Sequence, residues 1–345
     1  MHVPFCARRC DYCAFATWAD RAALMGDYAR ACVDEIGAAA LQPASSLFFG
    51  GGTPSLLPAE LLVSMVTAVA LAPGAEVTVE CNPDDLSADL LAAYRAAGVT
   101  RISLGVQSTQ PHVLAALGRT HDPTAAHRAA RMVADAGFAS WSVDLIFGAA
   151  GESEADWAAT LDAALGFGPP HVSAYALTVE PGTPLASDRR RHPDGDDQAA
   201  KYLAADQALS RAGLHSYEIS NWARPGHECR HNVLYWSQAS YRGIGCAAHS
   251  HQDGRRWWNV RAPERYIERV RQGRSVEAAG EMLGPEERRR ERLQLALRTR
   301  EGVPADAFAP EDLATLAGLV ERRGDRVVLT PAGRLLGNEV ALRLR

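Results

Sequence analysis

Short apolar runs alternate with longer amphipathic stretches through the first half of the chain. The apolar runs predict buried strands, at residues 47–49, 77–79, 102–104, 142–146 and 172–177. The amphipathic stretches predict helices at 58–71, 87–97, 124–136 and 154–166, and Gly98 and Gly137 mark the ends of two of them. Strand and helix in regular alternation are typical of a parallel sheet covered by helices.

These units predict a partial (β/α)6-type barrel over residues 1–187. No G-x-G-x-x-G follows the first strand, which argues against a Rossmann fold. A barrel places its active site at the carboxyl ends of its strands, so residues at those ends are the candidates for function.

Two further regions follow. Residues 188–280 are expected to form a C-terminal α/β extension that opens with a polar, solvated connection at 188–197. Residues 281–345 predict a small winged-helix-like domain, with helices at 286–299 and 313–322, a hairpin around Gly324 and a last helix capped at Thr330.

Composition narrows the class of protein. With 47% hydrophobic and 22% charged residues the chain can bury a core, and 36 basic against 41 acidic residues (net charge −5) argue against a dedicated nucleic-acid binder. We therefore interpret the arginine run 288–290 as a solvated helix face. No apolar stretch long enough for a membrane span and no signal-peptide pattern occur, and seven cysteines are too few for a disulfide scaffold. These features predict a cytoplasmic protein.

Three of the cysteines fall within eight residues, as Cys6-x3-Cys10-x2-Cys13. Three thiolates from one tight loop suit three irons of a [4Fe–4S] cluster and leave the fourth iron open. A structural zinc site, which usually has two well-separated ligand pairs, is the weaker alternative. The remaining cysteines, Cys32, Cys81, Cys229 and Cys246, are expected to be small buried residues.

The cysteine spacing, with Tyr12 before the third cysteine, resembles the radical S-adenosylmethionine (SAM) superfamily. The resemblance implies that the open iron chelates SAM, whose one-electron cleavage gives a 5′-deoxyadenosyl radical. The lead-in His2-Val3-Pro4-Phe5-Cys6 and the loop at 49–55, Phe-Gly-Gly-Gly-Thr-Pro-Ser, are similar to the oxygen-independent coproporphyrinogen III oxidase-like branch. In that branch a Tyr stands two residues before His2. This sequence begins at Met1, so we expect a short first strand and weakened SAM binding.

The same resemblance implies a SAM site at strand ends. Its expected members are Tyr12, Gly51, Gly52, Thr53, Glu80, Gln107, Arg119 and Asp144. Glycines after a strand would let backbone amides approach the ligand. Two members have plainer alternatives: Asp144 could cap a helix, and Arg119 could be an ordinary surface residue.

Phe15 stands where the true oxidase usually has a fourth cysteine. This substitution, together with the motif His231-Asn232-x-x-Tyr235-Trp236, resembles the HemW branch, the heme chaperones. The resemblance implies binding of heme and its transfer to an acceptor protein, with His231 as candidate heme ligand and His249 as a weaker one. His231 could instead satisfy backbone groups in a Trp-rich loop.

Two other functions are weighed against the chaperone. The first is a coproporphyrinogen III oxidase, which would make the chain a radical oxidoreductase; the missing fourth cysteine disfavours it. The second is a winged-helix regulator that senses redox state through the cluster; the acidic net charge disfavours it.

Overall fold

The computed structural model describes residues 1–119 and 122–345. Eight strands form the main sheet in the order β1-β2-β3-β4-β5-β6-β8-β7. The strands are β1 His2–Val3, β2 Ala44–Gly51, β3 Leu71–Cys81, β4 Arg101–Gln107, β5 Ser140–Phe147, β6 His171–Ala176, β7 His215–Ser216 and β8 Asn221–Ala223. The first six are parallel and lie side by side in chain order, and β8 pairs antiparallel with both β6 and β7. Within the described residues β7 does not pair back to β1, so the barrel is open, as predicted.

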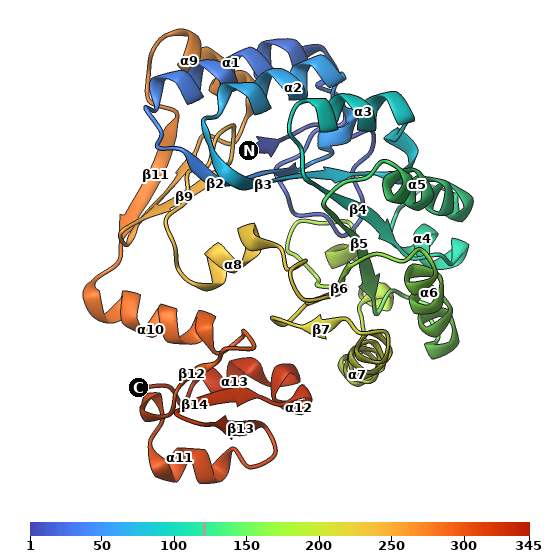
Figure 1. Cartoon of the computed structure of the whole chain (residues 1–345), viewed down its shortest axis with the longest axis vertical. Helices are drawn as coiled ribbons and strands as arrows, with labels where there is room; N and C mark the ends of the chain where they lie inside the picture. Colours follow the sequence, from blue (N-terminus) through green and yellow to red (C-terminus); the bar gives the residue numbers. More distant parts are fainter. Residues whose placement is uncertain (120–121) are drawn as a thin grey trace.

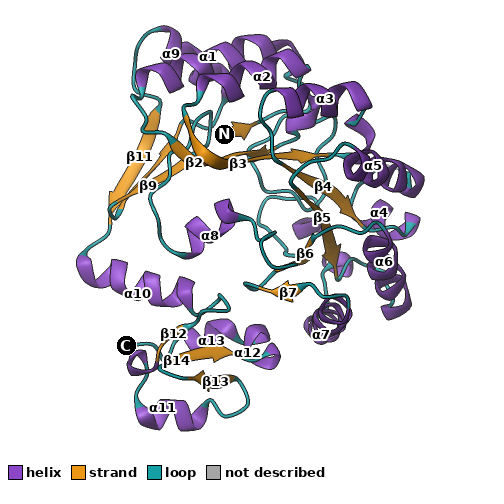
Figure 2. Ribbon diagram, viewed as in Figure 1, coloured by secondary structure: helices purple, strands orange, loops and turns teal. Residues whose placement is uncertain are grey.

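Helices cover the outer side of this sheet (Figures 1 and 2). They are α1 Met25–Ala38, α2 Ala59–Ala68, α3 Ala88–Ala96, α4 Pro111–Ala116, α5 Pro123–Asp135, α6 Glu154–Gly166 and α7 Gly195–Arg211. All five predicted strands and the four predicted helices are present. The helix predicted at 58–71 ends early, because Leu71 already begins β3, where Ala44 of β2 pairs with it.

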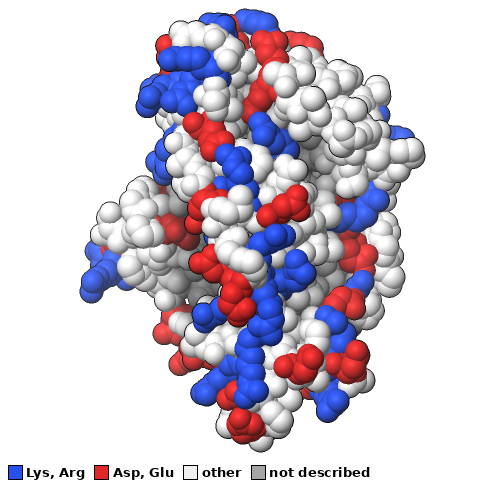
Figure 3. Space-filling view, turned by 90° about the vertical axis from the view of Figure 1, so that its left-hand side faces the viewer, with Lys and Arg blue, Asp and Glu red and all other residues white. Residues whose placement is uncertain are grey.

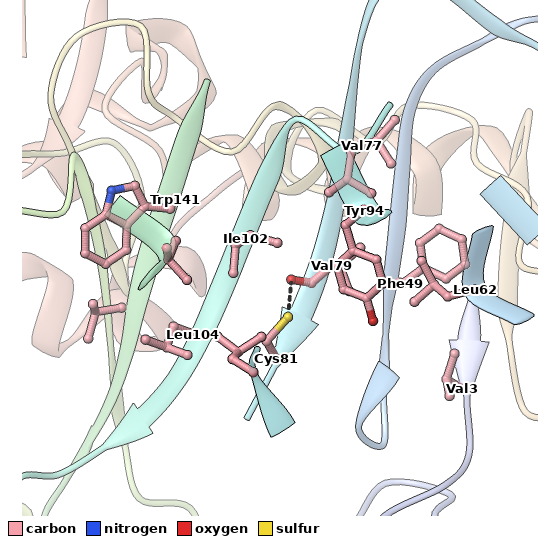
Figure 4. Close-up of a cluster of buried hydrophobic side chains, with 14 of the residues drawn as sticks. Val3, Phe49, Leu62, Val77, Val79, Cys81, Tyr94, Ile102, Leu104 and Trp141 are labelled. Carbon is pink, nitrogen blue, oxygen red and sulfur yellow. Dashed lines mark hydrogen bonds between the residues drawn. The ribbon is translucent and has the colours of Figure 1, made fainter. Parts of the chain in front are cut away.

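Successive side chains of each strand point alternately into the apolar core and into the barrel interior. In β4, Ile102, Leu104 and Val106 are fully buried, whereas Ser103, Gly105 and Gln107 line the inner cavity. Figure 4 shows Ile102 and Leu104 beside Val79 and Phe49 of the neighbouring strands, with Leu62 of α2 packed against the group. Each such apolar side chain stabilises the fold by roughly 1.5–3 kcal/mol. The polar residues inside the predicted strands are therefore those that face the interior.

The extension closes the edge of the sheet beside β1. A three-stranded antiparallel sheet, β9 His249–Gln252, β10 Arg255–Asn259 and β11 Glu277–Met282, is accompanied by α8 Arg230–Trp236 and α9 Pro263–Arg271. The His2 amide donates to the carbonyl of Ile244 at 2.9 Å. The buried Glu35 of α1 accepts from the Tyr266 hydroxyl of α9 at 2.6 Å, which ties the extension to the barrel. Strands β7 and β8 belong to the main sheet, so this sheet continues past the expected boundary at 187.

The connection at 188–197 is polar and contains no buried residue, as expected, but one of its arginines ties it to the rest of the molecule. Residues Leu185–Ser187 and Arg189–Arg191 form two 3-10 turns. The Arg191 guanidinium donates to Asp11 Oδ2 at 2.8 Å and to the Ala116 carbonyl at 2.6 Å. This ion pair holds the connection against the cysteine loop.

The C-terminal region has the order of a winged-helix domain. Its elements are α10 Pro285–Ala296, β12 Val303–Pro304, α11 Pro310–Thr315, β13 Val320–Arg323, β14 Arg326–Leu329, α12 Pro331–Leu335 and α13 Gly337–Ala341. It has its own apolar core, which includes Leu297, Val303, Phe308 and Val340. The predicted hairpin and the Thr330 cap are confirmed.

The helix predicted at 313–322 is misplaced. It lies earlier, at Pro310–Thr315, and residues 320–322 pair with β14 instead. Gly318 has a φ of +84°, a left-handed conformation that ends a helix.

Arginines and acids alternate along the face that carries α9, β11 and α10 (Figure 3). Arg255 pairs with Glu277 at 2.7 Å, and Arg256 pairs with Glu281 at 2.9 Å and with Glu291. This face is therefore a mixed, largely neutralised surface rather than a uniformly basic one. In the described ranges, no helix has the length and apolar character that a membrane crossing needs.

Candidate functional site

A cavity of about 650 Å³ opens at the carboxyl ends of the parallel strands. Eleven of the twelve predicted site residues line it: Cys6, Cys10, Tyr12, Cys13, Gly51, Gly52, Thr53, Glu80, Gln107, Arg119 and Asp144. They come from the cysteine loop, from the inner face and carboxyl ends of β2 to β5, and from the connections that follow β2 and β4. His231 is the exception. The barrel thus brings together residues that are more than 130 positions apart in the sequence.

The cysteine loop presents three free, partly exposed thiols. The Thr53 hydroxyl lies 3.5 Å from Cys6 Sγ, and Arg119 Nη1 lies 3.8 Å from Cys10 Sγ. In the uncomplexed chain burial raises the pKa of the Cys6 and Cys13 thiols. Hydrogen-bond donors beside the sulfurs favour thiolates, which are the form that binds iron.

No group of three or more His, Cys, Asp or Glu side chains converges on a single metal position within the described ranges. Each cysteine of a [4Fe–4S] cluster binds a different iron, so its thiolates stand apart from one another. The other four cysteines are buried, as expected.

The glycine loop packs closely against the strand that leads to the cysteines. A Cβ on Gly52 would lie 2.6 Å from the carbonyl oxygens of Val3 and Phe5, and Gly51 has a φ of +106°. The Gly52 amide donates to Val3 O and the Thr53 amide to Phe5 O, both at 2.7 Å. We expected these glycines to make room for a ligand. The close approach of the chain to itself already requires glycine at position 52. Both glycines also line the cavity, so their contact with a ligand stays a prediction.

Glu80 ends β3 beside the glycine loop. Its Oε2 accepts from the Gly51 amide at 3.3 Å. Burial, and next the negative charge of Asp144, raise the pKa of Glu80 to about 8. A carboxylate in this setting is suited to an ammonium group or a hydroxyl donor of a ligand, either of which would stabilise its charged form.

Arg119 is not an ordinary surface residue, since its guanidinium is held inside the cavity. Nη2 donates to Asn82 Oδ1 at 3.0 Å and to the Gly105 carbonyl at 2.9 Å. Asn82 in turn donates to the Thr53 hydroxyl at 3.3 Å, so it links the glycine loop to Arg119. Sequence reasoning missed Asn82. Its place two residues after Glu80, at the same strand end, was the signal that could have found it.

Asp144 lies within β5 and does not cap a helix, so that alternative was wrong. Three serine hydroxyls donate to its carboxylate: Ser103 of β4 at 2.6 Å, Ser173 of β6 at 2.7 Å and Ser142 of β5 itself at 3.5 Å. Burial raises the pKa of Asp144, and these hydroxyls oppose that rise. The carboxylate is therefore fixed in position by inward-facing serines, which the sequence analysis did not single out.

Two of the aromatic side chains that line the cavity are exposed. Phe15 is 65% exposed and Tyr175 is 41% exposed, and both contribute to its lining. Tyr175 follows Ser173 on the inner face of β6, so strict alternation along the strand could have identified it.

His231 lies on α8, outside the cavity lining. Its Nδ1 is 2.9 Å from the Ser46 hydroxyl, its Nε2 is 3.0 Å from the Tyr235 hydroxyl, and its ring stacks on Phe48. Burial lowers the pKa of His231 to about 4, which keeps the imidazole neutral. The next residue, Asn232, does line the cavity. His249 is exposed on β9 and stacks on Trp258.

Comparison with known proteins identifies the family. Residues 1–164 match the Radical SAM superfamily. A protein named heme chaperone HemW from Mycobacterium tuberculosis (strain H37Rv) is 43% identical, over 99% of this chain and 92% of its own length. The chain belongs to the HemW family. The HemW protein of Bacillus subtilis is 33% identical, over 99% of this chain and 97% of its own length. That of Escherichia coli is 36% identical, over 81% of this chain and 76% of its own length.

The fold extends beyond the HemW family. The coproporphyrinogen III oxidase HemN from Escherichia coli, described as a radical SAM enzyme, superimposes with a TM-score of 0.84 over 99% of this chain and 88% of HemN. The two sequences are 23% identical, so this likeness establishes a shared architecture. It confirms the partial barrel with its extension and C-terminal domain.

Proposed function

We propose that this protein is a heme chaperone that binds a [4Fe–4S] cluster and SAM in the large cavity and transfers heme to an acceptor protein. One observation carries the proposal. Eleven residues chosen for cluster and SAM binding line one cavity, in a chain related over nearly its whole length to proteins named heme chaperone HemW.

The donor set fits the cluster and SAM. Cys6, Cys10 and Cys13 would each hold one iron, and Thr53 and Arg119 would stabilise the thiolates. The acid Glu80 suits a cationic amino group or a ribose hydroxyl, and the guanidinium of Arg119 suits a carboxylate. Asp144 and Gln107 add polar groups on the same inner face.

When bound, the cluster and SAM supply one-electron chemistry. The protein's own part is positioning. Hydrogen bonds to Asn82 and Gly105 orient the Arg119 side chain, and the serine hydroxyls orient Asp144. These side chains would therefore lose little conformational freedom when a ligand binds. Tyr12 and Phe15 at the cavity would restrict access of water.

Heme would bind near α8, at the His231-Asn232-x-x-Tyr235-Trp236 segment. Val233 and Tyr235 are each 42% exposed there and offer apolar surface to a porphyrin. The neutral imidazole of His231 is a suitable axial ligand. To bind iron, the His231 imidazole would give up its hydrogen bond with the hydroxyl of either Ser46 or Tyr235.

The test is an anaerobic experiment on reconstituted protein. Heme loading is followed by the Soret band, and transfer by the spectrum of apomyoglobin added as a generic acceptor. A parallel sample receives coproporphyrinogen III, SAM and a reductant, and its porphyrins are separated by chromatography. We expect heme transfer and no protoporphyrinogen. Repeated turnover to protoporphyrinogen would make the protein an oxidase despite Phe15 and overturn the proposal.

The cluster is tested on the same preparation. Cys6→Ser, Cys10→Ser and Cys13→Ser should each abolish the brown chromophore and most of the bound iron. Cys32→Ala, a change at a buried cysteine of α1, should retain both. Four irons in a variant that lacks all three loop cysteines would show that the cluster, if any, is bound elsewhere.

A further inference from the structure

A second cavity, of about 310 Å³, lies between the main sheet and the C-terminal domain. One wall comes from α7 and β7, and the other from the end of α10, the β13–β14 hairpin and α12; Figure 1 shows these elements facing each other. Four arginines and one histidine line it against two acids: Arg298, Arg300, Arg323, Arg334 and His215 against Asp206 and Glu218. None of them lines the cysteine-containing cavity.

Both acids are engaged by other groups. Asp206 Oδ1 accepts from Arg334 and from Trp222 Nε1, each at 2.8 Å. Glu218 accepts from the Ser220 amide at 2.7 Å and from the Asn221 side chain, and burial raises the pKa of this carboxyl. Three of the arginines are paired with carboxylates: Arg334 with Asp206, Arg300 with Glu228 and Arg323 with Glu321. Among the described residues, Arg298 is therefore the arginine of this cleft that has no carboxylate partner.

Arg298 is the unusual member of the group. It follows α10, and its half-buried guanidinium donates only to neutral oxygens, the Gln294 carbonyl and Asn338 Oδ1. Desolvation is the sole cause that lowers its pKa, and no carboxylate of residues 1–119 or 122–345 lies within 4 Å of it. Two acceptors leave three of its five N–H groups without a partner among those residues. An anion that entered the cleft could pair with these N–H groups.

We propose that this cleft is a second ligand site, specific for the phosphate group of a small molecule. Guanidinium groups bind phosphate oxygens in a bidentate manner, and the hydroxyls of Ser210, Ser216 and Thr299 in the lining can add further hydrogen bonds. The volume exceeds that of a bare phosphate, so a nucleotide-sized molecule also fits. SAM carries no phosphate. The proposal is thus independent of the function assigned to the first cavity.

The test is isothermal titration of the full chain with inorganic phosphate, pyrophosphate and AMP in a low-salt chloride buffer. We expect saturable binding of at least one of them. Arg298→Met should weaken it by about tenfold or more, since a charge-assisted pair is lost. The matched control is Arg289→Met, an exposed arginine of α10 that pairs with Glu286, and it should bind like the wild type. Equal affinity for phosphate and AMP would identify a free oxyanion as ligand, and tighter AMP binding a nucleotide.

A second variant, at the edge of the cleft, keeps the proposal testable if Arg298→Met does not fold. Arg323 is exposed at the edge of the cleft, so Arg323→Gln should lower the affinity about threefold with an unchanged melting temperature. No saturable heat with any of the three probes up to about 10 mM would overturn the proposal. Wild-type affinity in both arginine variants would overturn it as well.

Discussion

At the scale of single residues, two carboxylates of the cavity, Glu80 and Asp144, have different surroundings. Asp144 is stabilised by three serine hydroxyls, whereas Glu80 receives one backbone amide and faces Asp144. The consequence is a Glu80 pKa of about 8 in the ligand-free chain. Titration of this group therefore couples the stability of the empty protein to pH.

Glu80→Gln should stabilise the SAM-free protein at alkaline pH. The carboxyl ionises near pH 4.5 when unfolded and near pH 8 when folded, so stability is lost as the pH rises between these values. Glutamine does not ionise, so the variant does not lose stability over this pH range. Its gain should be about 1 kcal/mol or less at pH 5 and roughly 4–5 kcal/mol at pH 8.5, measured by urea unfolding. Glu286→Gln, on the exposed surface of α10, is the control. An equal gain at both pH values would contradict the assigned shift.

At the scale of elements, helix α7 fastens the loops that follow β5 and β6. Lys201 is the only lysine in the sequence, and its side chain is fully buried. Its Nζ donates to the Glu152 carbonyl and to Asp197 Oδ2, each at 2.7 Å, and lies 3.2 Å from Glu152 Oε2. The ammonium group thus directs its three N–H donors at three oxygens that surround one position. The planar guanidinium of an arginine could not reproduce this arrangement.

Lys201→Met should destabilise the protein by about 3–5 kcal/mol, because a buried carboxylate loses its counter-charge. Urea unfolding is the measurement, and Arg211→Met at the exposed end of α7 is the control. Adding Glu152→Gln to the Lys201 variant should recover part of the loss. If the double variant is less stable than the single one, the buried pair is not what makes Lys201 necessary.

The strand leading to the cysteines and the glycine loop form another contact between elements. Gly52→Ala would force a Cβ against two carbonyl oxygens at 2.6 Å. We expect displacement of the cysteine loop and at least a twofold loss of bound iron after reconstitution. Gly166→Ala has no atom within 4 Å of the added methyl at the end of α6, so it should be neutral or stabilising by about 0.5–1 kcal/mol. Full iron content in Gly52→Ala would show that the loop tolerates the shift.

At the scale of the whole molecule, His231 lies outside the lining of the cavity proposed for SAM, although its neighbours Phe48 and Asn232 contribute to that lining. His231→Ala should therefore weaken heme binding by about tenfold, through loss of an axial ligand, while iron and SAM binding stay unchanged. Heme titration and iron analysis of one preparation decide this. An unaltered Soret band would place the ligand elsewhere, and His249→Ala would be the next variant.

The barrel and the cysteine loop could be predicted from the sequence pattern, and most of the cavity lining from the resemblance to the radical SAM family. Strands and helices leave a periodicity of two or 3.6 residues that is visible locally, and parallel strands necessarily bring their carboxyl ends to one edge. Glu80, Gln107 and Asp144 were predicted from the resemblance to the radical SAM family, and their places on successive parallel strands agree with that prediction. The motif at 231–236 indicated the family, but not where His231 directs its two nitrogens.

Which groups complete the sites depends on contacts between elements that are far apart in the sequence. Asn82 beside Arg119, the serines around Asp144, Arg191 against Asp11 and the arginine cleft join residues from separate elements, and no local pattern marks such pairs. The misplaced helix at 313–322 has the same origin, since pairing with β14 outweighs the helical preference of 320–322. Contacts over long sequence separation form through packing of whole elements, so their partners are set by the fold rather than by neighbours in the chain.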